Sequence, residues 1–220
     1  MQYLYNQNAG ENRLTISGED HKYLFKVRRY PIGKLLDLRN LEDKTLYTYK
    51  IQDISKKEAM LDLVDSSIDS DKDLKKVHLL WCIIDPKVIY STLPMLNQIG
   101  VSKITFIYCQ RSQKNFKVDI AKCEKILINS SQQSGRTTLM ELEILSDLEK
   151  AIKNYGEFAV VDFGGDLEWG EIESALIGCE GGFSPDERNT LIKHPKLGLK
   201  TANIVKSETA TLIFSTKTLI

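Results

Sequence analysis

The chain has 220 residues, with 42% hydrophobic and 27% charged side chains. These proportions are typical of a folded protein and exclude a disordered chain, a collagen-like fibre and a coiled-coil rod. Lys and Arg number 30, as do Asp and Glu, so contact with a nucleic acid must come from local basic patches rather than from net charge.

Neither a membrane span nor a secretion signal is expected. The longest apolar run, Leu79–Ile84, is far shorter than the roughly 20 residues that cross a bilayer. The first residues, MQYLYN, lack the charged and apolar regions of a signal peptide. The cysteines show no zinc-binding C-x-x-C pair and no dense disulfide framework, which favours a reducing compartment. We therefore expect a cytoplasmic protein that does not associate with membranes.

The first third of the chain predicts a small β-rich domain. Short extended segments at 35–38, 45–51 and 59–64 are separated by turn-forming residues, which is typical of a small β-barrel or sandwich. The polar segment 66–73 has no apolar periodicity and is the best candidate for a linker. We expect one domain over 1–70 and a second over 74–220.

The remainder alternates between strands and helices. Strands are predicted at 78–84, 103–108, 158–163 and 174–177, and helices at 86–98, 118–133 and 148–155. Asp85 and Pro86 form a helix start, Gly100 and Gly135 are helix ends, and Pro94 predicts a kink or a late start of the first helix. Alternating elements of this kind predict an α/β domain with a mostly parallel sheet.

The segment 177–187 is the most informative part of the chain. Gly178, Gly181 and Gly182 follow a strand, and we expect a positive φ angle at Gly181. Ser184 begins a helix, with proline next and Glu187 completing a capping box. The loop fits neither a P-loop nor a dinucleotide fingerprint. A ligand site at the carboxyl end of a strand and a plain structural turn both remain open.

A second glycine-bearing loop, 197–206, is predicted to lead through a short strand into a final helix capped by Ser207. It can form the opposite wall of one pocket, or simply be the last βα unit of the domain. Arg136, after the long helix, and Arg111, after a strand, can each meet a phosphate or a base edge. Alternatively, Arg136 satisfies the last carbonyls of its own helix.

Between Lys22 and Arg39 there are six basic residues and one acidic residue, interleaved with Tyr23, Phe25 and Tyr30. This pattern is consistent with an RNA-facing patch and equally with a solvated face. The three histidines are far apart in sequence and show no metal-ligand spacing, so each is expected to be structural.

Five segments together resemble the RsmE family of RNA methyltransferases. Residues 178–184 are similar to its GPEGG-F-S loop, and 197–198 with 205–210 to its LG…LR-x-ETA segment. Residues 133–136 are similar to its EQS-x-R segment, 110–112 to its RS strand end, and 21–29 to its N-terminal H…VLR stretch. The segments occur in family order along nearly the whole chain.

The resemblance implies a SPOUT trefoil-knotted α/β domain preceded by a small PUA-like β-barrel, in a homodimer. It also implies S-adenosyl-L-methionine as methyl donor and methylation of uridine N3 in 16S ribosomal RNA of the small ribosomal subunit. Two other functions remain open: a related RNA methyltransferase acting at another position, such as a ribose hydroxyl, and a non-catalytic RNA-binding or assembly factor.

Site residues follow from the resemblance position by position. It implies that Arg136, Lys206 and Arg111 face the RNA or the reacting base. The basic cluster described above assigns RNA binding to Lys22, Lys26, Arg28 and Arg29. The donor site it implies comprises Asp162, Gly164, Gly178, Glu180, Gly181, Gly182, Leu197, Gly198, Leu199, Val205 and Thr209. The chain departs from the family at Cys179 (proline), Lys206 (arginine) and Gln98 (glutamate), and 201–203 are an insertion.

Overall fold

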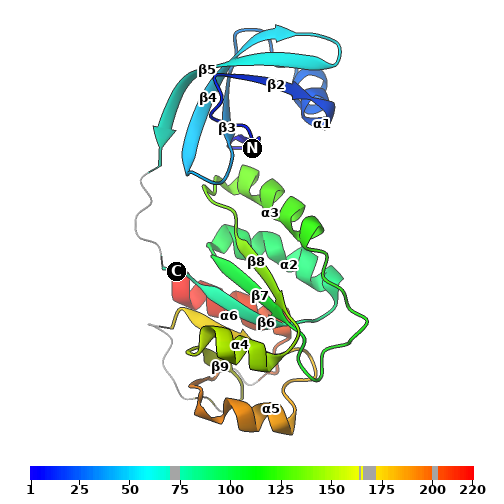
Figure 1. The fold of residues 1–220 in the computed structure, drawn as a ribbon, viewed down its shortest axis with the longest axis vertical. Coiled ribbons are helices and arrows are strands. Elements are labelled where there is room, and N and C mark those ends of the chain that lie inside the picture. The colour runs from blue at the N-terminus through cyan, green and yellow to red at the C-terminus, as the bar shows by residue number, and fades with distance from the viewer. Residues whose placement is uncertain (70–74, 164, 166–171, 200–202) are drawn as a thin grey trace. The chain divides into compact units, whose positions relative to one another are not determined.

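The structure is a computed structural model that describes residues 1–69, 75–163, 165, 172–199 and 203–220. The chain divides into two compact units (Figure 1). The first comprises Met1–Lys72 with Ser131–Leu139, and the second comprises Asp73–Ser130 with Met140–Ile220. The first unit therefore takes in a segment from the middle of the chain as well as the N-terminal part.

The first unit is a curled five-stranded sheet in the order β1-β3-β4-β5-β2. Its strands are β1 (Leu4–Tyr5), β2 (Arg13–Ser17), β3 (Leu35–Arg39), β4 (Thr45–Ile54) and β5 (Glu58–Ile68). Helix α1 (Gly18–His21) and a π-helical segment (Lys22–Val27) follow β2. Apolar side chains that alternate along the strands form its core, including Leu38, Ile51 and Leu61, all fully buried.

The three predicted strands of this unit are confirmed as β3, β4 and β5. Strand β5 runs to Ile68, into the predicted linker, because Ile68 pairs with Thr45 of β4. Asp69 follows the strand, and the remaining linker residues, 70–73, lie outside the described residues. Strands β1 and β2 were not predicted. Both are stabilised by partners distant in sequence: β1 pairs with β3, and β2 pairs with β5.

The second unit is built on a six-stranded parallel sheet in the order β11-β9-β10-β6-β7-β8. Its strands are β6 (His78–Cys82), β7 (Lys103–Ile107), β8 (Glu141–Leu145), β9 (Ala159–Val161), β10 (Ser174–Ile177) and β11 (Lys196–Leu197). Its helices are α2 (Pro86–Ile99), α3 (Ile120–Ser134), α4 (Leu148–Tyr155), α5 (Pro185–Thr190) and α6 (Ser207–Leu219), with a 3-10 turn at Leu191–Lys193.

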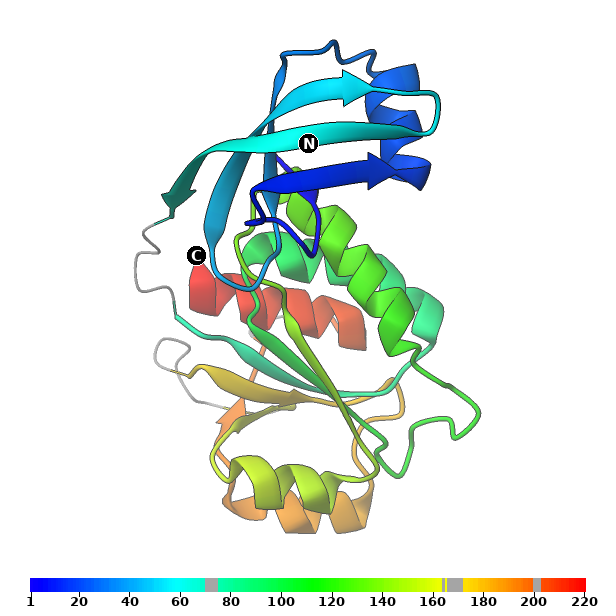
Figure 2. The ribbon, with the colours of Figure 1, turned by 45° about the horizontal axis from the view of Figure 1, so that its top comes forward.

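Helices cover both faces of this sheet. Figure 2 shows α2 and α6 on one face and α4 and α5 on the other, and α2 packs directly against α6. Because both faces are covered, the central strands are apolar along their length, as in Leu79, Leu80 and Trp81 of β6, which are fully buried. The predicted α/β fold with a parallel sheet is confirmed.

Local signals located the helix ends well. The Asp85 carboxylate accepts the backbone N–H of Lys87 at 2.8 Å, and Gly100 ends α2 with a φ of 108°. The predicted late start at Pro94 is wrong, because α2 begins at Pro86 and includes Pro94. Strands β8 and β11 were not predicted. We expected a strand between the second glycine loop and α6; among the described residues of that stretch, the strand is β11, at the start of the loop.

Candidate functional site

A pocket of about 620 Å³ opens at the carboxyl ends of β9 and β10. Residues 177–183 form one wall, and Leu199 with 203–207 form another. We call it the loop pocket. Its volume lies in the range of about 300–1,000 Å³ that small-molecule and cofactor sites occupy. The two glycine-bearing loops therefore face one cavity, which is the first of the two alternatives that the residues left open for the second loop.

Most of the residues assigned to the donor site line this pocket. They are Asp162, Gly178, Glu180, Gly181, Gly182, Leu199 and Val205, and Lys206 lies among them. Three others lie elsewhere: Leu197 is buried in β11, Gly198 lies where its backbone meets that of Gly165, and Thr209 is exposed on α6. Gly164 lies outside the described residues, as do residues 201 and 202 of the insertion.

The first loop closes as a tight turn. The backbone N–H of Gly182 donates to the carbonyl of Cys179 at 2.8 Å, and the Cys179 thiol donates to the Gly182 carbonyl at 3.8 Å. Gly182 has a φ of 64°, a conformation that favours glycine. The expectation that Gly181 holds the positive φ is wrong, because the turn reverses one residue later.

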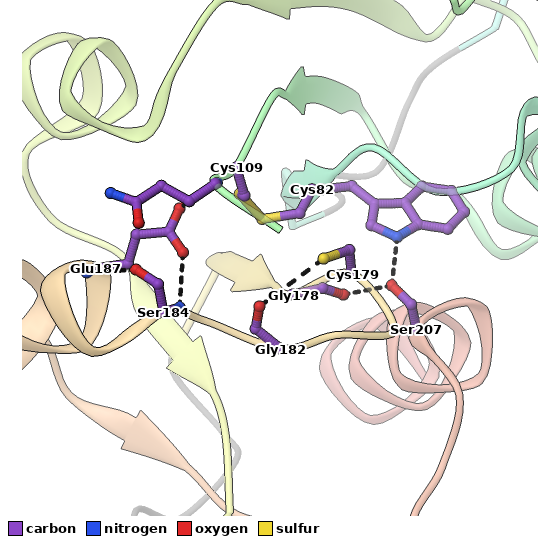
Figure 3. Close-up of a disulfide and its surroundings, with 10 residues drawn as sticks. Cys82, Cys109, Gly178, Cys179, Gly182, Ser184, Glu187 and Ser207 are labelled. Carbon is purple, nitrogen blue, oxygen red and sulfur yellow. Dashed lines mark hydrogen bonds between the residues drawn. A yellow bond between two sulfur atoms is a disulfide. The ribbon is translucent and has the colours of Figure 1, made fainter. Parts of the chain in front are cut away.

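The predicted capping box of α5 is confirmed and also anchors a neighbouring loop. Ser184 and Glu187 exchange hydrogen bonds between side chain and backbone, at 3.1 and 2.9 Å (Figure 3). The other Glu187 oxygen accepts the backbone N–H of Gln110 at 2.8 Å. Buried Glu187 thus connects the glycine loop to the segment after β7 that carries Arg111.

The prediction that Ser207 caps α6 is wrong. Lys206 occupies the N-cap position, and Ser207 is the first helical residue. The Ser207 hydroxyl instead accepts the indole N–H of Trp81 at 2.8 Å and donates to the Gly178 carbonyl at 2.5 Å (Figure 3). These partners are 126 and 29 residues away, so only tertiary packing selects them over the local cap.

Arg188 of α5 is a pocket residue that the sequence analysis missed. Its guanidinium makes a two-point ion pair with the Asp162 carboxylate after β9, with Nη2 3.3 Å from Oδ1. The Asp162 side chain is 7% exposed, so Arg188 neutralises a nearly buried charge beside the pocket. The two residues are 26 apart, and no local pattern in the sequence connects them.

Glycine is required where the segment after β9 meets the loop after β11. A Cβ on Gly165 would lie 2.6 Å from the carbonyl carbon of Leu197, and a Cβ on Gly198 would overlap the Gly165 carbonyl. Real Cβ atoms do not come so close to backbone atoms. The resemblance assigned Gly198 to the donor site, whereas the structure shows this glycine permitting the backbone contact with Gly165.

The three residues assigned to the reacting base have different surroundings. The Arg111 guanidinium donates to the Gly181 carbonyl at 2.7 Å, which places its charge beside the glycine loop. Lys206 lines the pocket with a side chain that is 80% exposed, and its ammonium lies 4.0 Å from the Glu208 carboxylate.

Arg136 belongs to the first unit. Its Nε donates to the Thr138 carbonyl at 2.9 Å, and its own carbonyl accepts the Tyr3 hydroxyl at 2.6 Å. Burial lowers the pKa of Arg136 to about 10, so its guanidinium remains protonated at neutral pH.

The four basic residues assigned to RNA, Lys22, Lys26, Arg28 and Arg29, are all exposed on or just after the π-helical segment. The aromatic residues between them, Tyr23, Phe25 and Tyr30, are half-buried against the core of the first unit. The basic side chains are therefore more accessible than the rings, which suits contact with phosphates better than stacking on bases.

Cys82 at the end of β6 and Cys109, two residues after β7, form a disulfide with a Cα–Cα distance of 5.7 Å (Figure 3). The other two cysteines, Cys123 and Cys179, are buried thiols. The chain thus has one disulfide, which the spacing of its cysteines did not indicate, beside the segment that carries Gln110 and Arg111.

Within the part of the chain that the structure describes, none of the helices is long and apolar enough to span a membrane. His, Cys, Asp and Glu side chains do not gather there in groups of three that would suit a metal ion. His21, His78 and His194 each bond within the fold, to Ser55, Thr105 and Phe158.

Known families match both parts of the chain. Residues 71–218 match the family described as RNA methyltransferase domain, and residues 16–64 match the RNA methyltransferase PUA domain. Two curated relatives from strains of Helicobacter pylori are 42% and 41% identical over 220 residues, covering 96% of this chain and 96% of each relative. Both are named ribosomal RNA small subunit methyltransferase E.

Solved structures share the fold at lower identity. A ribosomal RNA small subunit methyltransferase E from Neisseria gonorrhoeae, bound to S-adenosyl methionine, is similar with a TM-score of 0.80 and 18% identity. The match covers 98% of this chain and 96% of that chain. A Legionella pneumophila methyltransferase in complex with the same cofactor has a TM-score of 0.78 and 22% identity, over 98% and 95% of the two chains.

The sheet, the loop pocket and the matched domains define the class: an RNA methyltransferase with a PUA domain. Within that class, the chain belongs to the ribosomal RNA small subunit methyltransferase E family, RsmE. The resemblance found in the sequence motifs is therefore confirmed, as is the fold class with its PUA-like first part. The trefoil knot, which the resemblance also implies, stays a prediction.

Proposed function

We propose that this chain transfers a methyl group from S-adenosyl-L-methionine to N3 of a uridine in 16S ribosomal RNA of the small ribosomal subunit. The observation that carries this proposal is the loop pocket, in which two glycine-bearing loops line one cavity at the carboxyl ends of parallel strands. Family membership supports the reaction and the class of substrate.

The pocket is suited to the donor in size and in its chemical groups. Close approach of a ligand to backbone N–H and C=O groups is possible along Gly178, Gly181 and Gly182, and Leu199 and Val205 add apolar walls. When bound, S-adenosyl-L-methionine supplies a methyl group on a sulfonium, so the chain needs no covalent intermediate. Its residues have to orient the donor and the uridine and to exclude water.

The cationic side chains favour the reactive form of the base. Uridine N3 must lose its proton to accept a methyl group, and the resulting anion is stabilised by nearby positive charge. Arg111 is held beside the glycine loop by the Gly181 carbonyl, and Lys206 lies on the pocket wall. We assign both to this role, together with Arg136 of the first unit.

We assign RNA docking to the exposed basic side chains of the first unit, Lys22, Lys26, Arg28 and Arg29. Ion pairs with phosphates hold an RNA without reading its sequence, so binding through this surface weakens as salt rises. Because small subunits are assembled in the cytoplasm, we place the enzyme there, and we expect it to act as a homodimer. Light scattering tests the oligomeric state.

The function is tested by transfer of a tritiated methyl group from S-adenosyl-L-methionine to small subunits that lack the modification. The labelled RNA is digested and its nucleosides are separated. We expect label in 3-methyluridine. Label on a ribose would support the related methyltransferase with another target position. A folded chain that neither binds the donor nor transfers label would support the non-catalytic factor.

A further inference from the structure

Ser207 is the residue through which the two walls of the loop pocket are joined. It lies at the start of α6 and is 6% exposed, and its hydroxyl bonds to Gly178 at the start of the first glycine loop. Both residues line the pocket. A single hydroxyl therefore connects residues 29 positions apart on opposite sides of the proposed donor site.

Trp81 determines the direction of this hydrogen bond. Its indole N–H can only donate, and at 2.8 Å it occupies a lone pair of the Ser207 oxygen. The hydroxyl is then left with its own proton, which it donates to the Gly178 carbonyl at 2.5 Å. Trp81 is fully buried in β6 and pairs with Ile177 of β10, the residue before Gly178. It is thus a rigid support for both partners.

The hydrogen bond from Ser207 to Gly178 orients the first peptide of the glycine loop. The carbonyl of Gly178 and the N–H of Cys179 belong to one planar peptide unit, so fixing the carbonyl fixes that N–H as well. Further along, the loop closes through the bonds between Cys179 and Gly182. Ser207 therefore orients the first peptide of a loop whose later residues are held by the turn itself.

We propose that Ser207, supported by Trp81, is a positioning residue for the donor site. It sets the orientation of the Gly178–Cys179 peptide and joins the glycine loop to the start of α6, so that the pocket is formed before the donor binds. This inference rests on the proposed function, because it assumes that S-adenosyl-L-methionine binds in the loop pocket.

Calorimetry with S-adenosyl-L-methionine tests the inference on the full chain. Ser207→Ala should weaken donor binding about tenfold, the scale of one hydrogen bond whose loss leaves a buried N–H unpartnered. Ser207→Thr keeps the hydroxyl and should restore affinity to within about twofold of the original chain. At saturating donor, Ser207→Ala should keep its kcat while its KM for the donor rises, which a general loss of stability would not produce.

Trp81→Phe keeps an aromatic ring but removes the N–H donor together with part of the buried indole, so it should weaken donor binding in the same direction. If Ser207→Ala does not fold, Trp81→Phe is the variant that tests the inference. Thermal unfolding shows whether each variant is folded. Unchanged donor affinity in a folded Ser207→Ala or Trp81→Phe chain would overturn the inference and leave the proposed function intact. An original chain that does not bind the donor would overturn both.

Discussion

The disulfide between Cys82 and Cys109 permits a quantitative prediction about stability. It closes a loop over a sequence separation of 27 residues. A cross-link over that length removes unfolded-state entropy worth about 3.5 kcal/mol at 25 °C. Reduction should therefore lower the free energy of unfolding by about that amount. For a chain of this size the corresponding fall in melting temperature is roughly 10 °C.

The first measurement is a count of thiols in the denatured, unreduced protein. Of the four cysteines, only Cys123 and Cys179 are thiols in the structure, so two thiols are expected. Urea unfolding with and without a phosphine reductant then gives the change in stability. The control variant Cys82→Ala/Cys109→Ala should not respond to the reductant, whereas Cys123→Ala should keep the full response.

Reduction should also affect the loop that follows Cys109. Gln110 donates to Glu187, and Arg111 donates to Gly181, so this segment bonds both to α5 and to the glycine loop. We expect weaker binding of S-adenosyl-L-methionine by the reduced protein. Four thiols in the unreduced chain, or a stability that the reductant leaves unchanged, would refute the reasoning.

Three further predictions concern the site and the pH dependence. Gly182→Val should reduce donor affinity at least tenfold, because valine is strained at a φ of 64°, whereas Gly156→Val at a φ of 62° after α4 should leave calorimetric donor binding unchanged. Arg136→Ala should slow methyl transfer about a hundredfold with donor affinity retained; a loss of donor binding instead would contradict the assigned role. Burial, with Lys103 nearby, lowers the pKa of His78 from 6.5 to about 4. Between pH 6.5 and about 4, the imidazole of the unfolded chain therefore takes up a proton that the folded one does not. The contribution of His78 to the free energy of unfolding is complete above pH 6.5 and is lost as the pH falls toward 4. Urea unfolding at pH 7 and pH 5 should show this loss, and it should be smaller in His78→Gln.

Several features of this protein could be predicted because their causes are local. The capping box of α5 needs only Ser184, a following proline and Glu187, and the start of α2 needs only Asp85 and Pro86. Continuous apolar runs indicated the central parallel strands, since strands buried on both faces have no polar side. The two glycine loops were also recognisable from the sequence, because the residues of each loop are close together in the chain.

Other features depended on partners that lie far away in sequence. Strands β1 and β2 are short, and their backbone groups are paired by β3 and β5. Arg188 was missed because its carboxylate partner, Asp162, is brought to it only by the packing of α5 near the end of β9. The segment around Arg136 belongs to the first unit although its helix begins in the second.

Ser207 shows how a contact between residues distant in sequence can replace the interaction that the local sequence predicts. Its place before a helix predicted a cap, which is the local choice for a serine hydroxyl. In the fold, Trp81 and Gly178 lie within hydrogen-bond distance, and they take the hydroxyl instead. The sequence alone determined the family, the alternation of strands and helices, and the loops that line the pocket, because each depends on residues that are close together in the chain. The tertiary structure decided which side chains join those loops, because a hydrogen bond or ion pair depends on distance in space.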